Sequence, residues 1–444
     1  MTVKITDLKF ILPQTHAIIK KYIISKNDLY ISIAGSIGKI GIIPDSLDGS
    51  NLTENAAKIT DLRNVDKRFL CHFLNSNFAQ EQIKDLIIST NQPKLALFRI
   101  EKITTPIAPH PEQLRIVSRI EELFSRLDAG VEALQKAKAQ LRRYRQAVLK
   151  ATVEGRLTEE WRKTHPMVET AEMLRERIQE EMRIKLGKKY APSNVDSESL
   201  PKLPIGWIWI SIEQVALVET GATPLRSNPK YYDEGEIPWV TSGSLNDSFV
   251  TEADEFITEL AIKETNAKVF PINALLVAMY GEGKTRGKVS ELLIEASTNQ
   301  ACAALLFEGK AESIKSYIKI FFEKNYEDIR RLSSGGVQPN LNLSIIKATK
   351  IPLPPLKELE LIVKEIENNF TRIGEVTTVL DQDLKVADRL CQSILKRAFE
   401  GMLVPQDPSD EPASVLLERI KAERTKEPPR RGRRNETSQM RLIQ

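Results

Sequence analysis

Apolar residues recur at steps of three, four and seven along two long stretches of the chain, 105–157 and 351–403. The seam of the first runs through Ile116, Ile120, Leu127, Leu134, Leu141 and Val148, and that of the second through Ile362, Ile366, Ile373, Leu380 and Ile394. So narrow a seam is typical of a long helix that pairs with another long helix. Packing of each helix on its own domain alone is the alternative.

The boundaries of both helices are also marked in the sequence. Prolines precede each stretch, where they oppose an earlier helical start, and a Glu-Gly pair near each end permits a stop. The pattern therefore predicts one long helix over 109–157 and another over 355–403.

The two stretches are copies of one another. They align without a gap at an offset of 246 positions, which pairs Pro106 with Pro352, Phe124 with Phe370, and Gly155 with Gly401. Weaker similarity extends upstream, where 27–43 matches 273–289 and 91–100 matches 337–346. The repeating unit is a domain of short strands and turns followed by a long helix, which predicts an α+β protein.

The repeat predicts the domain organisation. We expect a first mixed domain at 1–108, the first long helix at 109–157, a charged helical linker at 158–202, a second mixed domain at 203–354, the second long helix at 355–403, and a C-terminal helix with a basic disordered tail at 404–444. Residues 203–246 of the second domain have no counterpart in the first, because Met1 aligns with Asp247. The linker should carry a helix with Ala171, Leu174, Ile178 and Met182 on one face.

Composition narrows the function classes. The net charge of the 444 residues is only +4, so any nucleic-acid-binding surface must be local. The three cysteines and four histidines are scattered without metal-ligand spacing, so we expect no metal site and no cofactor bound by this chain. The sequence contains no run of 18 apolar residues, so we expect a soluble, cytoplasmic protein.

One stretch, "VAMYGEGKTRGKV" at 277–289, looks at first like a phosphate-binding P-loop. A P-loop needs glycine five residues before its final glycine, and Ala278 stands there. A helix should also begin at Lys284 and Thr285, yet Gly287 follows at once. We therefore interpret the stretch as a strand-to-strand turn and reject an ATPase.

The same stretch carries candidate DNA contacts. If it is extended, Lys284, Arg286 and Lys288 share one face, where they could bind DNA phosphates, and the arginine could bind the edge of a guanine. A solvated cationic hairpin is the alternative.

The order of four stretches resembles that of type I restriction-modification specificity (S, HsdS) subunits. They are "LPIGWIWISIEQV", "GATPLRSNPKYYDEGEIPWVTSGSL", "GGVQPNLNLSIIKATKIPLPPLKELELIV" and "LKRAFEGMLVPQDPSDEPASVLLERIKAER". The resemblance covers nearly the whole chain. It departs from the family in the first domain, which shows no match to "LPIGWIW" or to the "GATP" and "IPW" stretches.

This resemblance implies a fold and a function. It implies two target recognition domains separated by two long antiparallel coiled-coil helices, each domain reading one half of a split DNA target. It further implies a non-catalytic subunit whose partners are double-stranded DNA, methyltransferase (M) subunits and restriction (R) subunits. S-adenosylmethionine, ATP and Mg are then expected on those partner subunits. A coiled-coil scaffold, or an inactive specificity subunit without independent DNA recognition, is the alternative.

Candidate DNA-contacting residues lie in the loops of these stretches. From the second domain they are Thr223, Arg226, Ser242, Ser244, Lys284, Thr285, Arg286, Lys288, Gln338 and Asn340, and from the first domain Ser36, Lys39 and Gln92. Hydroxyl, amide and cationic side chains can bind phosphates or base edges. Ordinary turns and helix caps would use the same residue types, so that interpretation stays open.

Overall fold

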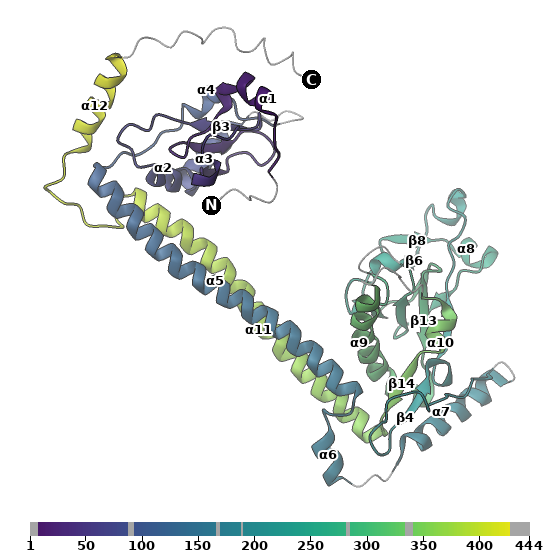
Figure 1. Cartoon of the computed structure of the whole chain (residues 1–444). Coiled ribbons are helices and arrows are strands. Elements are labelled where there is room, and N and C mark those ends of the chain that lie inside the picture. The colour runs from purple at the N-terminus through teal and green to yellow at the C-terminus, as the bar shows by residue number, and fades with distance from the viewer. Residues whose placement is uncertain are drawn as a thin grey trace. The chain divides into compact units, whose positions relative to one another are not determined.

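The computed structural model describes residues 8–87, 93–165, 169–187, 190–280, 285–333 and 341–426. The chain divides into two compact units, one made of Met1–Lys136 with Val379–Gln444 and the other of Ala137–Thr378. Each unit combines a mixed domain with part of each of two long helices (Figure 1). The predicted basic tail at 427–444 lies outside the described residues.

The long helices are α5, His110–Val153, and α11, Leu356–Phe399. In the first unit, the start of α5 packs against the end of α11, where Ile116 and Ile120 share a core cluster with Leu395 and Ala398. In the second unit, the end of α5 meets the start of α11, where the hydroxyl of Tyr144 donates to Asn369 Oδ1 at 3.1 Å. The start of each helix thus contacts the end of the other, so the two helices run antiparallel, as the resemblance implies.

The first unit carries a small antiparallel sheet covered by helices. Its elements are α1 Pro13–Ile18, η2 Lys20–Tyr22, β1 Leu29–Ser32, β2 Ile40–Ile42, η3 Asp45–Leu47, β3 Ala56–Ile59, α2 Lys67–Leu74, α3 Asn77–Asp85, α4 Leu97–Ile100 and α12 Ala413–Lys426. The strand order is β2-β1-β3. The Asp66 side chain caps α2 and the Ser76 side chain caps α3, each by accepting backbone N–H groups of the first turn. Both helices then bury aromatic and aliphatic residues, such as Phe73 and Ile83, against the sheet.

The second unit is larger. Its elements besides the long helices are α6 Glu159–Thr164, α7 Ala171–Leu186, β4 Ile208–Ser211, η5 Ile212–Gln214, β5 Leu217–Thr220, η6 Pro229–Tyr231, β6 Ile237–Val240, η7 Ser242–Ser244, β7 Phe249–Val250, β8 Glu255–Ile257, α8 Glu259–Glu264, β9 Val269–Phe270, β10 Leu275–Ala278, β11 Val289–Leu292, β12 Ala296–Thr298, β13 Cys302–Leu306, η8 Gly309–Ile314, α9 Lys315–Ser333, α10 Leu343–Lys347 and β14 Lys350–Leu353. In the described residues these strands form sheets ordered β5-β13-β10-β11-β7, β8-β6-β12-β9 and β14-β4.

The β5-β13-β10-β11-β7 sheet is buried on both faces. Successive side chains of a strand point to opposite faces, and β10 divides its residues accordingly. Leu276 packs with Val240 and Phe270 of the β8-β6-β12-β9 sheet. Leu275 and its neighbours on the other face join the cluster formed with α7, α9 and the ends of the long helices. This sandwich fixes the positions of the loops that leave its strands.

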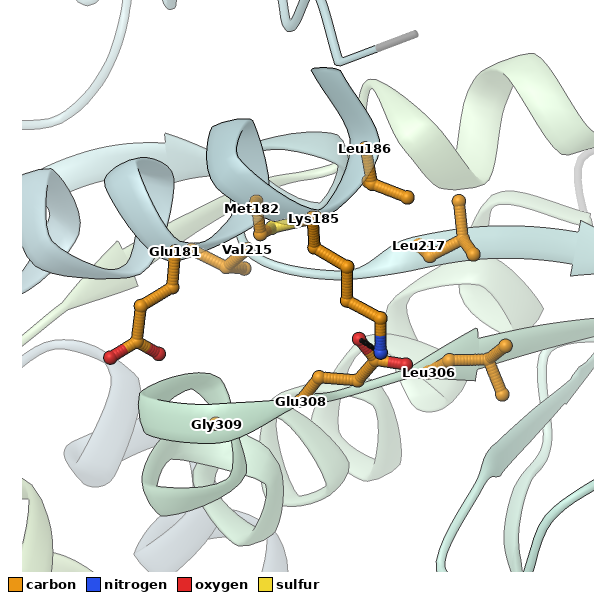
Figure 2. A pocket seen from close by; sticks show the side chains of 9 residues that line it. All are labelled: Glu181, Met182, Lys185, Leu186, Val215, Leu217, Leu306, Glu308 and Gly309. Carbon is orange, nitrogen blue, oxygen red and sulfur yellow. Dashed lines mark ion pairs between the residues drawn. The ribbon is translucent and has the colours of Figure 1, made fainter.

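Helix α7 is the amphipathic helix predicted in the linker. Ala171, Leu174 and Ile178 are buried, as predicted, and Thr170 caps its first turn. A cavity of about 190 Å³ lies between α7 and strands β5 and β13 (Figure 2). Its carboxylates are already engaged: Glu181 accepts the N–H of Lys310 at 2.9 Å, and Glu308 pairs with Lys185. We therefore interpret the cavity as part of the seam along which α7 is fastened to the domain.

A buried carboxylate at the start of α11 holds together three segments of the second unit. Glu358 is fully buried and accepts hydrogen bonds from the Thr158 hydroxyl at 2.6 Å and the Trp207 indole N–H at 2.9 Å. The guanidinium of Arg162 pairs with it at 2.7 Å. One side chain therefore joins the segment after α5, the segment before β4, and α11.

Candidate nucleic-acid interface

Several strand ends of the second unit meet at one edge of its sheets. Thr220 at the end of β5 pairs with Ala303, beside the start of β13, and Ala278 at the end of β10 pairs with Cys302. β6 and β12 run parallel, with Val240 opposite Thr298, so they end together. The loops that follow β5, β6, β10 and β12 consequently lie near one another, although up to about 80 residues separate them in the sequence.

Hydrogen bonds hold these loops together. The Thr223 hydroxyl bonds to the Gln300 amide oxygen, which joins the loop after β5 to the loop after β12. The Trp239 indole N–H donates to the Ala222 carbonyl at 3.1 Å, and the Asn299 N–H donates to the Val240 carbonyl at 3.1 Å. Trp239 itself is buried, so its role is to anchor a loop. This edge is a connected surface rather than a set of independent turns.

Gly221 has a structural reason to be glycine. A Cβ atom at this position would collide with the carbonyl of Thr298 on β12. The end of β5 therefore approaches the end of β12 more closely than any side chain would permit. Close packing thus explains this glycine without a DNA contact.

Arg226 lies at the same loop but is held by protein groups. Its guanidinium pairs with the carboxylate of Glu255, with one N–O distance of 3.1 Å. It also lies 4.7 Å from the centroid of the Trp239 ring and 5.0 Å from that of the Tyr232 ring. Just over half of its side chain is exposed, so it lies at the surface with its charge partly balanced by Glu255.

The described parts of the P-loop-like stretch, 277–280 and 285–289, lead out of one strand and into its antiparallel neighbour. β10 pairs antiparallel with β11, with Val277 opposite Val289, and the N–H of Gly287 donates to the Ala278 carbonyl at 2.7 Å. Gly287 has φ of +81°, which favours glycine in this turn. The next regular element after the turn is a strand, whereas a P-loop would lead into a helix. The strands on either side of the stretch thus pair with each other, as the interpretation of a strand-to-strand turn predicts.

The cationic and hydroxyl candidates of this edge are at its surface. Lys288 Nζ donates to Asn246 Oδ1 at 3.0 Å, which links the hairpin to the loop after β6. Thr285 and Arg286 lie in the same turn and are half-buried. Ser242 and Ser244 are half-buried in η7, directly after β6. The fold thus brings together loops that lie apart in the sequence and carry the candidate residues.

The other candidates lie elsewhere. Ser36 and Lys39 are exposed in the turn between β1 and β2 of the first unit, where the Lys39 N–H donates to the Ser32 hydroxyl at 2.9 Å. Lys284, Gln338, Asn340 and Gln92 lie outside the described residues. Gln300 and Asn246 were missed, since nothing local in "STNQAC" or "LNDS" marks them as partners of Thr223 and Lys288.

Other classes of site find little support in the described residues. No group of three or more His, Cys, Asp or Glu side chains there is arranged to hold a metal ion. Burial raises the pKa of the Cys71 thiol to about 11 and that of Cys302 to about 12, which disfavours the reactive thiolate. None of the described helices has the length and apolar character needed to span a bilayer.

Comparison with known proteins points to one family. A family model described as the type I restriction modification DNA specificity domain matches residues 5–139 and 204–380. The specificity subunit of the type I restriction enzyme EcoKI from Escherichia coli strain K12 is 25% identical over 369 residues, which cover 80% of this chain and 71% of that protein. The StySPI specificity subunit from Salmonella potsdam is also 25% identical, over 81% of this chain and 72% of its own length.

A solved structure has the same fold. A chain from work on complex assembly and conformational transition of the type I R-M system superposes with a TM-score of 0.63 at 17% identity, covering 85% of this chain and 83% of the other. The α+β architecture with two mixed domains and long helices is therefore shared.

Proposed function

As the chain belongs to the family of type I restriction modification DNA specificity proteins, we propose that the strand-end loops of its second unit read one half of a bipartite DNA target. The chain is a DNA sequence-recognition subunit of a type I restriction-modification complex. Its partners are double-stranded DNA, methyltransferase subunits and restriction subunits.

The observation that carries the assignment is the convergence of loops at one edge of the second unit's sheets. Thr223, Ser242 and Ser244 bring hydroxyl groups to this edge, and Arg286 and Lys288 bring positive charge. Hydroxyl and cationic groups on neighbouring loops can donate hydrogen bonds to DNA phosphates and to the acceptor atoms of base edges. Gln300, held by Thr223, joins them as a side chain able to bind a base through its amide.

We assign the chain no catalytic step of its own. The candidate edge offers hydrogen-bond donors and charge, and the chemistry of adenine methylation and ATP-driven cleavage belongs in this proposal to the partner subunits. S-adenosylmethionine, ATP and Mg would bind there. We place the working complex in the cytoplasm, beside its DNA.

The test is a double variant assembled with its methyltransferase subunits. Replacing Lys284 and Arg286 with alanine should weaken DNA binding and flatten its dependence on salt concentration, since each lost phosphate contact lowers the slope by about one. A matched control replaces Lys163 and Arg183, two exposed cations of α6 and α7, with alanine. Normal methylation of target DNA by the Lys284 and Arg286 variant at moderate salt would remove these residues from the interface.

A further inference from the structure

In the second unit, residues 203–218 are held from two sides by elements distant in sequence. β4 pairs antiparallel with β14, which places Ile210 opposite Ile351 and Ile208 opposite Leu353. From the other side, the N–H of Ala171 at the start of α7 donates to the Gly206 carbonyl at 3.1 Å. The buried face of α7 belongs to the same core cluster as Trp207, Ile210, Ile212, Val215 and Ala216. The segment is thus a layer between β14 and α7.

The first unit contains counterparts of both flanking elements. Residues 104–107 align with β14, since Pro106 matches Pro352. Helix α12 aligns with α7, since Leu416 matches Leu174. Even the local ion pairs repeat, because Arg419 pairs with Glu411 as Arg177 pairs with Glu169. Within the described residues, no counterpart of β4 accompanies them.

The edge of 104–107 that corresponds to the β4 side is open. The Thr104 N–H and carbonyl both bond to the Gln82 side chain, at 2.8 and 3.1 Å. Successive residues of an extended segment direct these groups to opposite sides, so those of Thr105 and Ile107 face away from Gln82. They are the counterparts of Ile351 and Leu353. Across the described ranges, no hydrogen bond reaches the backbone of Thr105 or Ile107.

The face of α12 is open as well. Ala171 and Ile178 of α7 are 0% and 1% exposed, whereas their counterparts Ala413 and Ile420 are half-exposed. The Ala413 N–H has no hydrogen-bond partner in the part of the chain that the structure describes, although the matching N–H of Ala171 has Gly206. Leu416 on this face is already buried at 3% exposure, so the open part of the face is formed by Ala413 and Ile420, whose counterparts in the second unit are covered.

We propose that 104–107 and α12 form a binding site for an extended segment with the chemistry of Leu203–Val218. Such a segment adds a strand to Thr105 and Ile107 and lays its apolar side chains on Ala413 and Ile420. Both open surfaces fit the same occupant, because their counterparts β14 and α7 both lie against Leu203–Val218 in the second unit. The site is an interaction surface for a peptide strand, separate from the DNA-reading edge, and does not rest on that function.

The first experiment adds a fluorescein-labelled synthetic peptide, residues 203–218 of this chain, to the full chain. We expect saturable binding of one peptide per chain, measured by fluorescence anisotropy, and no binding of a scrambled peptide. Amide hydrogen exchange should slow at Thr105, Ile107 and Ala413 when the peptide is bound. Absence of binding, or protection of other amides only, would overturn the proposal.

The second experiment uses a matched pair of variants on α12. Ile420→Asp should weaken peptide binding about tenfold or more, because it places a charge on the face that the peptide covers. Val415→Asp, on the opposite side of the helix, where the side chain is 39% exposed, should change affinity less than about twofold. Equal loss in both variants would refute the site, provided circular dichroism shows both folded. Ile420→Thr, a milder change, should weaken binding in the same direction. Protection of Thr105 and Ile107 that grows with protein concentration without peptide would instead assign the edge to self-association.

Discussion

Glu291 of β11 keeps a negative charge largely out of water. Its carboxylate pairs with Lys315 Nζ at 2.7 Å and Lys319 Nζ at 3.1 Å, and the Lys319 ammonium lies 3.7 Å from the centroid of the Phe249 ring. Burial alone would raise the pKa of Glu291, but the hydrogen bonds and charges of the two lysines outweigh it. The pKa therefore lies below its ordinary value of 4.5.

This depressed pKa predicts a pH dependence of stability. The unfolded chain binds the proton more tightly, so the stabilisation from Glu291 is complete above about pH 4.5 and is lost as the pH falls through the folded-state pKa. In Glu291→Gln, the free energy of unfolding should be lower at pH 7 and should depend less on pH in the acid range. Urea titrations at pH 7 and below pH 4.5 measure this.

The exposed Glu252 offers a control for this prediction. Glu252→Gln should leave the free energy of unfolding within about 0.5 kcal/mol of the parent at pH 7. If the free energy of unfolding depended on pH equally in Glu291→Gln and in the parent below pH 4.5, the assigned role of the triad of Glu291, Lys315 and Lys319 would be contradicted.

Residue partnerships were the least predictable part of the chain. Thr223 could be selected from its loop, but its partner Gln300 stands 77 positions away and Glu255 stands 29 positions from Arg226. Glu358 joins Thr158 across 200 positions. Such pairs depend on the three-dimensional course of the chain, which periodicity does not encode. The sequence could therefore predict the loops of the candidate interface but not the hydrogen bonds that hold them together.

At the scale of elements, helices were easier to predict than strands. α5 and α11 each span 44 residues, long enough for a seam to recur through many turns. β10 and β13 are four and five residues long and almost wholly buried, so they show no alternation of polar and apolar positions. The repeat indicated short strands and turns, but the sheet orders follow from pairings distant in sequence.

Helix α7 gives an element-scale prediction. Leu174→Ala should lower the free energy of unfolding of the second unit by about 2–5 kcal/mol, because Leu174 is buried against that domain. Met173→Ala, at a neighbouring position that is 51% exposed, should cost less than about 1 kcal/mol. Chemical denaturation of both variants compares them directly. Similar costs would show that α7 contributes little packing free energy to the domain.

At the scale of the whole molecule, the prediction concerns the DNA target. Two recognition units in one chain should direct methylation to a split adenine-containing sequence when the chain is expressed with its methyltransferase subunits. Single-molecule sequencing of modified bases across the host genome measures this. A palindromic motif would instead indicate paired copies of the second unit, and the absence of any motif would contradict DNA reading by this chain.

The triad of Glu291, Lys315 and Lys319 also constrains how the two halves of the gene can exchange segments. Leu29 pairs with Ile42 in the first unit as Leu275 pairs with Glu291 in the second, so Ile42 occupies the position of Glu291. When the starts of α2 and α9 are aligned, Cys71 matches Lys319. The first unit therefore has Ile42 and Cys71 where the second has Glu291 and Lys319, while Lys67 stands in the place of Lys315. A crossover that carried α9 without β11 would leave two ammonium groups beside isoleucine. Recombinants that fold should inherit residues 291–319 as one block.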